Sequence, residues 1–254
     1  TSFYAMYDFA RQICGDKADV YIMCPTSQEP HDYEPTAKDI ANLSSCDVFI
    51  YNSMGMEHWV DSVIDSLELS DVICVNTTEN ILNITDNSDP HVWLNPGNAY
   101  LQMTEIYKAV VIADPKNAEY YIENLENCKS KIDILINDYA TAADSFKSTD
   151  IVVSHKAYAN LCDAFGLNQV SINGIDNSQD PSPSQMALTE KFILDNGVKY
   201  IFKEPLGTSS VVDTIAKDTN TGVLVLDPFE GNSENKDYFT VMYENLDALK
   251  TALS

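Results

Sequence analysis

Positive charge is scarce in this sequence, and its scarcity narrows the range of partners. Among 254 residues, 15 lysines and arginines stand against 39 aspartates and glutamates, so the net charge is -24. Such an acidic surface repels phosphate backbones and anionic lipid headgroups, which argues strongly against nucleic acid or an anionic membrane surface as a partner. The same charge attracts cations, although it also serves simply to keep an exposed protein in solution.

Long apolar runs are missing as well. No run approaches the length of a membrane-spanning helix, and the chain opens at Thr1-Ser2-Phe3-Tyr4 without the basic and apolar regions of a signal peptide. The six cysteines are too widely spread for a zinc ribbon and too few for a disulfide scaffold. The length suits one large or two ordinary domains with a full core.

Short apolar runs, each followed by a turn or helix signal, alternate along both ends of the chain. We expect strands in the first part at residues 20–24, 48–51 and 72–75. The pattern resumes with expected strands at residues 150–153, 169–172, 198–202 and 222–226. Repeats of this βα type predict an α/β fold with parallel sheets.

A helical segment separates these two parts. From Pro115 to Phe146 the chain has no glycine and no internal proline, and its apolar residues recur three and four positions apart. At about 1.5 Å per residue, this predicts one helix of roughly 45 Å. We therefore expect an N-terminal α/β lobe at 1–112, a linking helix at 113–147 and a C-terminal α/β lobe at 148–254.

Three of the four histidines and one aspartate lie beside expected strand or helix ends. His31 follows the first expected strand, and His91 precedes a helix start marked by Asn95-Pro96. His155 and Asp227 come directly after expected strands. Because ligands collect at the carboxyl ends of strands in open α/β sheets, these four side chains are expected to meet in a cleft between the lobes, as a tetrahedral site suited to zinc. From the residues alone, unrelated surface or capping histidines are the alternative.

Several motifs carry a resemblance to a known family. Residues 89–96 read DPHVWLNP and residues 29–35 read EPHDYEP, with further matches at 55–59, 154–158, 181–183 and 226–228. Together they resemble the substrate-binding proteins of bacterial ABC transporters for zinc and manganese. The resemblance covers nearly the whole chain. It implies two lobes joined by a single long helix, with a metal held by His31, His91, His155 and Asp227.

The resemblance also bears on the choice of metal. Members of the manganese-importing branch generally carry glutamate where this chain has His155, so Zn²⁺ is favoured, with Mn²⁺ and Fe²⁺ as the alternatives. Glu57 and Glu204 match acidic positions near the metal in this family, which implies roles as partners of the ligands or as alternative ligands. Many zinc-binding members have a histidine-rich loop before the motif found here at residues 89–96, but residues 77–88 contain no histidine.

The function implied is that of the extracytoplasmic component of an ABC importer. It would act as a monomer that captures the metal ion and delivers it to the membrane permease, without chemistry on the ion. In this family a signal peptide and a lipid-anchored cysteine precede the corresponding start, so a cell-surface lipoprotein or a periplasmic protein is expected. A zinc hydrolase using Glu57 or Glu204 as general base is the alternative from another class, and an adhesin role would leave no mark in the sequence.

Overall fold

The computed structural model describes residues 1–66, 71–81, 89–174, 181–206, 210–231 and 236–254. Residues 82–88 of the segment without histidine lie outside these ranges. Within the described ranges, no helix combines the length and the apolar character needed to cross a membrane. The long helix α5 (Ala118–Ala143) divides the chain into an N-terminal half before it and a C-terminal half after it, and both terms are used in that sense below.

The N-terminal half contains a small parallel sheet formed by two strands, β1 (Val48–Tyr51) and β2 (Ile73–Asn76). Its helices are α1 (Tyr4–Cys14), α2 (Ala37–Leu43), α3 (Val60–Ser66) and α4 (Pro96–Ala113), with single 3-10 turns at Pro30–Asp32 and Val92–Leu94.

Residues 20–24 do not form the strand that their apolar pattern predicts. The backbone N–H groups of Met23 and Cys24 donate to the carbonyl oxygens of Thr1 and Ser2 at 2.9 Å each, and the carbonyl oxygen of Tyr21 accepts from the N-terminal ammonium group of Thr1 at 2.8 Å. Pro25 follows directly, and because proline has no N–H, the pairing cannot continue.

The C-terminal half contains a four-stranded parallel sheet with the order β4-β3-β5-β6. Its strands are β3 (Asp150–Val153), β4 (Asn168–Ser171), β5 (Tyr200–Lys203) and β6 (Gly222–Val225), each within two residues of the run expected from the sequence. Its helices are α6 (Ala159–Phe165), α7 (Pro183–Asn196), α8 (Ser210–Thr219) and α9 (Tyr238–Leu253). Parallel strands end at one edge of the sheet, so the residues after β3, β5 and β6 lie near one another.

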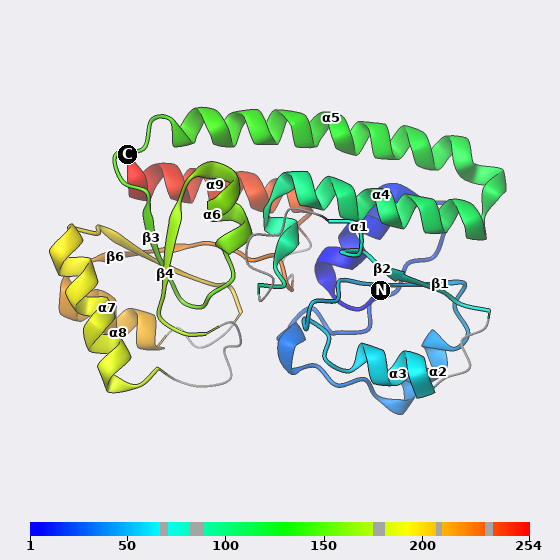
Figure 1. Cartoon of the computed structure of the whole chain (residues 1–254), viewed down its shortest axis with the longest axis horizontal. Coiled ribbons are helices and arrows are strands. Elements are labelled where there is room, and N and C mark those ends of the chain that lie inside the picture. Colours follow the sequence, from blue (N-terminus) through cyan, green and yellow to red (C-terminus); the bar gives the residue numbers. More distant parts are fainter. Residues whose placement is uncertain (67–70, 82–88, 175–180, 207–209, 232–235) are drawn as a thin grey trace.

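Helix α5 confirms the predicted long helix, with shorter ends. A 3-10 turn at Pro115–Asn117 precedes it, and it ends at Ala143 before reaching Phe146. Its 26 residues extend about 39 Å at 1.5 Å per residue. Figure 1 shows α5 lying along both halves of the molecule, above α4 on one side and α9 on the other. Contacts with α1 and α4 in one half and with α6 and α9 in the other make it a spine for the fold.

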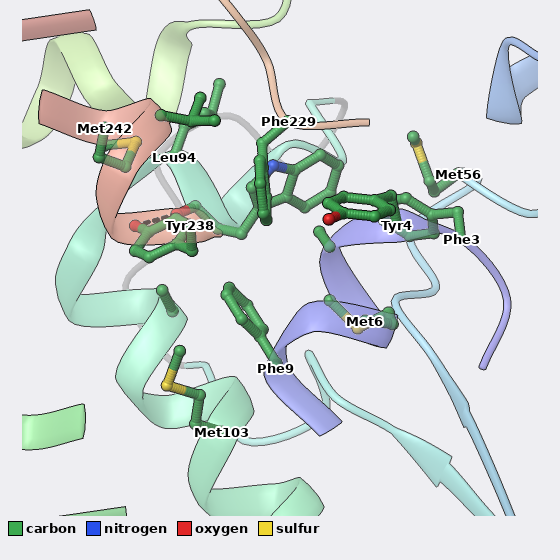
Figure 2. Close-up of a cluster of buried hydrophobic side chains, with 14 of the residues drawn as sticks. Phe3, Tyr4, Met6, Phe9, Met56, Leu94, Met103, Phe229, Tyr238 and Met242 are labelled. Atoms are coloured by element: carbon green, nitrogen blue, oxygen red, sulfur yellow. Dashed lines mark hydrogen bonds between the residues drawn. The ribbon is translucent and has the colours of Figure 1, made fainter. Parts of the chain in front are cut away.

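One apolar core continues from the N-terminal half into the C-terminal half. Phe9 of α1 packs edge-on against Tyr238 of α9 with ring centroids 5.1 Å apart, and Tyr4 packs against Phe229 at 5.2 Å. Figure 2 shows these side chains together with Met103 of α4. Because the two halves share this core, pulling them apart would expose apolar surface to water.

Candidate metal centre

His91 lies on a short turn that its flanking residues hold firmly. The side chain of Asn95 accepts a hydrogen bond from the backbone N–H of Gly97 at 2.9 Å and caps α4, which Pro96 begins as predicted. His91 itself is fully buried. Its ring Nδ1 lies 2.6 Å from Oδ1 of Asp89, and its Nε2 lies 2.6 Å from Oε1 of Glu230.

Carboxylates at both ring nitrogens hold His91 in its charged form. Burial alone would lower the pKa of the imidazole. The hydrogen bonds with Asp89 and Glu230 outweigh this effect and raise the pKa of His91 to about 10. The two carboxylates therefore favour the charged form of the imidazole at neutral pH.

His155 enters from the C-terminal half, just after β3. Its Nδ1 lies 2.5 Å from Oε1 of Glu204, the residue that follows β5. The hydroxyl of Ser154 donates to the same oxygen at 2.6 Å. With Nδ1 directed at a carboxylate, His155 presents Nε2 to the interior of the site, at 3.8 Å from Oε1 of Glu230.

His31 completes the set of imidazoles from the 3-10 turn Pro30–Asp32. Its Nε2 lies 3.1 Å from Nε2 of His91 and 3.8 Å from Oε1 of Glu230. Its side chain is 8% exposed, whereas those of His91 and His155 are essentially inaccessible. His31 is thus the imidazole of the three that lies nearest to solvent.

Glu230 supplies a carboxylate from the loop after β6. Phe229, the residue before it, is fully buried and takes a left-handed backbone conformation with φ of 61°. A left-handed non-glycine residue costs roughly 1–2 kcal/mol, so the surrounding contacts must hold this turn in place. Burial would raise the pKa of Glu230, but the hydrogen bond with His91 and the charges of the other two histidines lower it below its usual range.

These four side chains form one compact group of ligand atoms. One atom from each of His31, His91, His155 and Glu230 lies within 4.8 Å of all the others. In a tetrahedral zinc site with bonds of about 2.0–2.1 Å, ligand atoms are separated by roughly 3.3 Å. The observed separations of 3.1 Å and 3.8 Å around His31 bracket that value. The donor set therefore fits a small divalent ion that prefers nitrogen and oxygen ligands.

Asp227 was expected from the sequence in this group, and the structure places it outside. Its Oδ1 accepts a hydrogen bond from the backbone N–H of Phe229 at 2.8 Å, within its own loop. Burial, with the negative charges of Glu230 and Glu204, raises the pKa of Asp227 to about 7. Asn245 of α9 binds the backbone N–H and carbonyl of Asp227 at 2.8 Å each. Asp227 thus shapes the loop that presents Glu230.

Glu57 also lies outside the group, just before α3. Its carboxylate accepts hydrogen bonds from the hydroxyl of Ser2 at 2.6 Å and from the backbone N–H groups of Asn52 and Ser53 at 2.9 Å each. The side chain of Asn52 in turn donates to the carbonyl oxygen of Pro90 at 2.9 Å. Glu57 therefore supports the turn that carries His91 through two intermediates.

Two residues of the site escape the sequence pattern. Glu230 lies three positions after Asp227, so a search for every carboxylate shortly after an expected strand would have included it. Asp89 belongs to the same motif as His91, yet its contact with the imidazole depends on a local turn of the chain. Glu29, two residues before His31, also interacts with the site: burial together with the charge of Glu230 raises the pKa of Glu29 to about 10.

The parallel sheets, with three histidines and a carboxylate brought together between the halves, form an α/β protein with a candidate metal centre. A family model described as zinc-uptake complex component A, periplasmic, matches residues 1–252. The chain belongs to this family.

Named relatives agree with that assignment. The high-affinity zinc uptake system protein ZnuA of Bacillus subtilis (strain 168) is 36% identical over 276 aligned positions, which cover 100% of this chain and 86% of the relative. The zinc-binding protein AdcA of Streptococcus pyogenes serotype M1 is 32% identical over 281 positions, covering 98% of this chain. The chain spans only 55% of that AdcA, so it matches about half of the longer relative.

Solved structures match over nearly the whole length of the chain. The metal-dependent lipoprotein YcdH of Bacillus subtilis has a TM-score of 0.90 and 38% identity, covering 100% of this chain and 98% of that one. The Zn(II)-bound ZnuA-like domain of Streptococcus pneumoniae AdcA has a TM-score of 0.88 and 31% identity, with 99% and 97% covered. The fold expected from the sequence is confirmed by these likenesses.

Proposed function

We propose that this protein captures Zn²⁺ between its two halves and delivers it to the membrane subunits of an ABC importer. The observation that carries the proposal is the convergence of three imidazoles and one carboxylate within 4.8 Å. The bound zinc of the similar AdcA domain supports the same reading. Zinc is then the cargo of the protein and takes part in no reaction there.

The ligands in this proposal are His31, His91, His155 and Glu230. Glu230 takes the place that the sequence suggests for Asp227, because its Oε1 faces the imidazole nitrogens, whereas Asp227 accepts a bond from its own loop. Glu204 acts as the partner of His155 and fixes Nε2 as the coordinating nitrogen.

The donor set also supports zinc over manganese. Once bound to the ion, three imidazoles without a proton on the coordinating nitrogen and one carboxylate make a softer site than the oxygen-rich sets that suit Mn²⁺. His155 is decisive here, because a glutamate in its place would give two carboxylates against two imidazoles. Iron(II) shares some of the preference for imidazole, and competition between metals is the way to rank it.

A carrier fits these residues better than a zinc hydrolase. A hydrolase needs an open coordination position and a nearby general base. Four protein ligands fill a tetrahedral ion, and the carboxylates of Glu57 and Glu204 are engaged by hydrogen-bond donors. In this proposal both carboxylates support the site and neither acts as a general base.

The remaining features of the proposal follow from the family. The protein would work outside the cytoplasm as a monomer, either anchored as a lipoprotein or in a periplasm, with no nucleic acid as partner. Its units would be an N-terminal lobe at 1–112, a linking helix at 113–147 and a C-terminal lobe at 148–254. The continuous helix α5 and the two separate sheets support this division.

Metal content tests the proposal. Purified protein, stripped and reloaded, would be analysed by elemental mass spectrometry and by competition titration with zinc and manganese, beside His155→Ala and His58→Ala. His58 is half-exposed and bonds to Glu34 away from the site, so its variant is the matched control. One tightly held zinc per chain in the wild type and in His58→Ala, weakened by orders of magnitude in His155→Ala, is expected. A preference for manganese, or zinc binding indifferent to His155, would contradict the proposal.

A further inference from the structure

Asp89 makes hydrogen bonds into both halves of the molecule. Its Oδ1 accepts from the ring Nδ1 of His91 at 2.6 Å and from the backbone N–H of the same residue at 3.0 Å. Its Oδ2 accepts from the backbone N–H of Ala159 at 3.1 Å. Ala159 is the first residue of α6 in the C-terminal half. Because Asp89 is fully buried, water does not compete for these bonds.

The chain between His155 and Ala159 is short and closely held. The backbone N–H of Ala157 bonds to the carbonyl of His155 at 3.0 Å. The next residue, Tyr158, is fixed at its backbone N–H by the side chain of Gln169 at 3.0 Å. The position of the Ala159 N–H is therefore tied to that of His155. One carboxylate connects this segment with the imidazole of His91.

We propose that Asp89 is a positioning residue that sets the spacing between His91 and His155, and so fits the site to a tetrahedral ion. This inference rests on the zinc site proposed above and adds a residue that does not touch the metal. The two imidazole rings are 5.3 Å apart between centroids. If Asp89 releases one half, this spacing can widen, and the site then tolerates ions that prefer more ligands and longer bonds.

The chemistry of the carboxylate is essential to this role. An asparagine at position 89 has one acceptor oxygen, while the second position becomes an N–H donor. That donor would face the N–H of Ala159 in one orientation of the amide, and the N–H groups of His91 in the other. In either orientation, the asparagine loses the hydrogen bond to one of the two halves. Glu204 differs in how it holds its histidine: the hydrogen bonds from His155 and Ser154 both end on Oε1, so a glutamine oxygen can accept both.

The test compares Asp89→Asn with Glu204→Gln, and uses Asp8→Asn as the matched control. Asp8 of α1 also accepts a backbone N–H across the halves, from Tyr238 at 3.1 Å, but it contacts none of the four ligands. Zinc and manganese affinities would be measured by competition for each full chain. Visible absorption of the Co²⁺-loaded proteins would then report the geometry, because four-coordinate Co²⁺ absorbs far more strongly than six-coordinate Co²⁺.

We expect Asp89→Asn to lose about 100-fold in zinc affinity and Glu204→Gln about tenfold, within the range seen for partners of metal-bound histidines. The preference for zinc over manganese narrows, and the Co²⁺ bands weaken, in Asp89→Asn alone. Asp8→Asn keeps the affinity and the spectrum of the wild type. Equal losses in Asp89→Asn and Glu204→Gln with an unchanged Co²⁺ spectrum would overturn the inference.

Two further readouts separate the possible failures. If the wild type holds no zinc, the proposed function fails before the role of Asp89 is addressed. If Asp89→Asn does not fold, amide hydrogen exchange of Ala159 in the wild type replaces it. Zinc bound to His91 should slow that exchange, because the ion fixes the imidazole that is hydrogen-bonded to Asp89. Exchange unchanged by zinc would count against the inference.

Discussion

The indole Nε1 of Trp93 donates a hydrogen bond of 2.7 Å to the carbonyl oxygen of Pro228. This bond joins the segment that carries His91 to the segment that carries Glu230, from opposite halves of the molecule. A second hydrogen bond joins the two halves, because the hydroxyl of Tyr238 donates to the carbonyl oxygen of Trp93 at 2.8 Å. The two halves are therefore bonded to each other beside the metal centre by protein groups alone.

Small overall motion on metal binding is the first expected consequence. The shared core, the link through Trp93 and the continuous helix α5 all oppose a wide opening of the halves. Small-angle X-ray scattering of stripped and zinc-loaded protein should give the same radius of gyration within error. A large decrease on loading would contradict this account and would indicate a hinge across α5.

Trp93→Phe should destabilise the fold through the lost link. The variant keeps an aromatic ring but leaves the buried carbonyl of Pro228 without its donor, which costs about 1–3 kcal/mol. Urea denaturation measures the loss. Trp59→Phe is the matched control, because the Nε1 of Trp59 is buried and has no hydrogen-bond partner among the described residues. Equal destabilisation of the two variants would mean that the bond to Pro228 contributes nothing.

Zinc binding should release protons near neutral pH. Hydrogen bonds with Asp89 and Glu230 raise the pKa of His91 to about 10 against the effect of burial, so Nε2 is protonated at pH 7.5. A metal ion must displace that proton, and affinity should therefore rise about tenfold per pH unit between roughly pH 7 and 9. Calorimetry in buffers of different ionisation enthalpy counts the protons. Binding without proton release at pH 7.5 would exclude a protonated His91 as a ligand.

Asp8→Asn should stabilise the protein at neutral pH. Burial raises the pKa of Asp8 from 3.8 to about 6, against hydrogen bonds from Gln12 and Tyr238. The folded state thus holds a proton between about pH 4 and 6 that the unfolded state has lost, so this carboxylate reduces stability as pH rises through that window. The cost above pH 6 is on the order of 2–3 kcal/mol.

The neutral amide avoids that cost and keeps an acceptor for the two donors of Asp8. Thermal unfolding of zinc-free protein should show a higher midpoint for Asp8→Asn at pH 7.5, by about 5 °C or more. The difference between variant and wild type should disappear below about pH 3, where Asp8 is protonated in both the folded and the unfolded protein. A midpoint unchanged or lowered at pH 7.5 would show that the charge on Asp8 is needed by its neighbours.

Local signals in the sequence account for much of the fold. The capping boxes at Thr36–Asp39 and Ser182–Gln185 depend on local sequence alone, because their hydrogen bonds join residues three positions apart. The strands of the C-terminal sheet are confirmed for a similar reason, since buried parallel strands leave continuous apolar runs. Such features need no knowledge of the tertiary structure.

The composition of the site depends on tertiary geometry instead. Phe229 turns in the left-handed region, which its residue type does not favour, so nothing local indicates that Glu230 faces the histidines while Asp227 faces its own loop. The hydrogen bond that Oδ2 of Asp89 accepts from the N–H of Ala159 joins residues 70 positions apart. Pairing of this kind follows from how the halves pack. His91 and His155 lie beside element ends, as expected, whereas the strand expected before His31 does not form and His31 lies within the 3-10 turn Pro30–Asp32.

X-ray absorption at the zinc edge identifies the ligands of the bound ion, and would be recorded on zinc-loaded wild type, Glu230→Gln and Asp227→Asn. Four nitrogen or oxygen ligands at about 2.0–2.1 Å, with the outer-shell scattering of three imidazoles, are expected in the wild type and in Asp227→Asn. Glu230→Gln should lose affinity and show a changed coordination shell. A six-coordinate ion in the wild type would contradict the ligand set of three histidines and Glu230. A coordination shell altered by Asp227→Asn and unchanged by Glu230→Gln would contradict it as well.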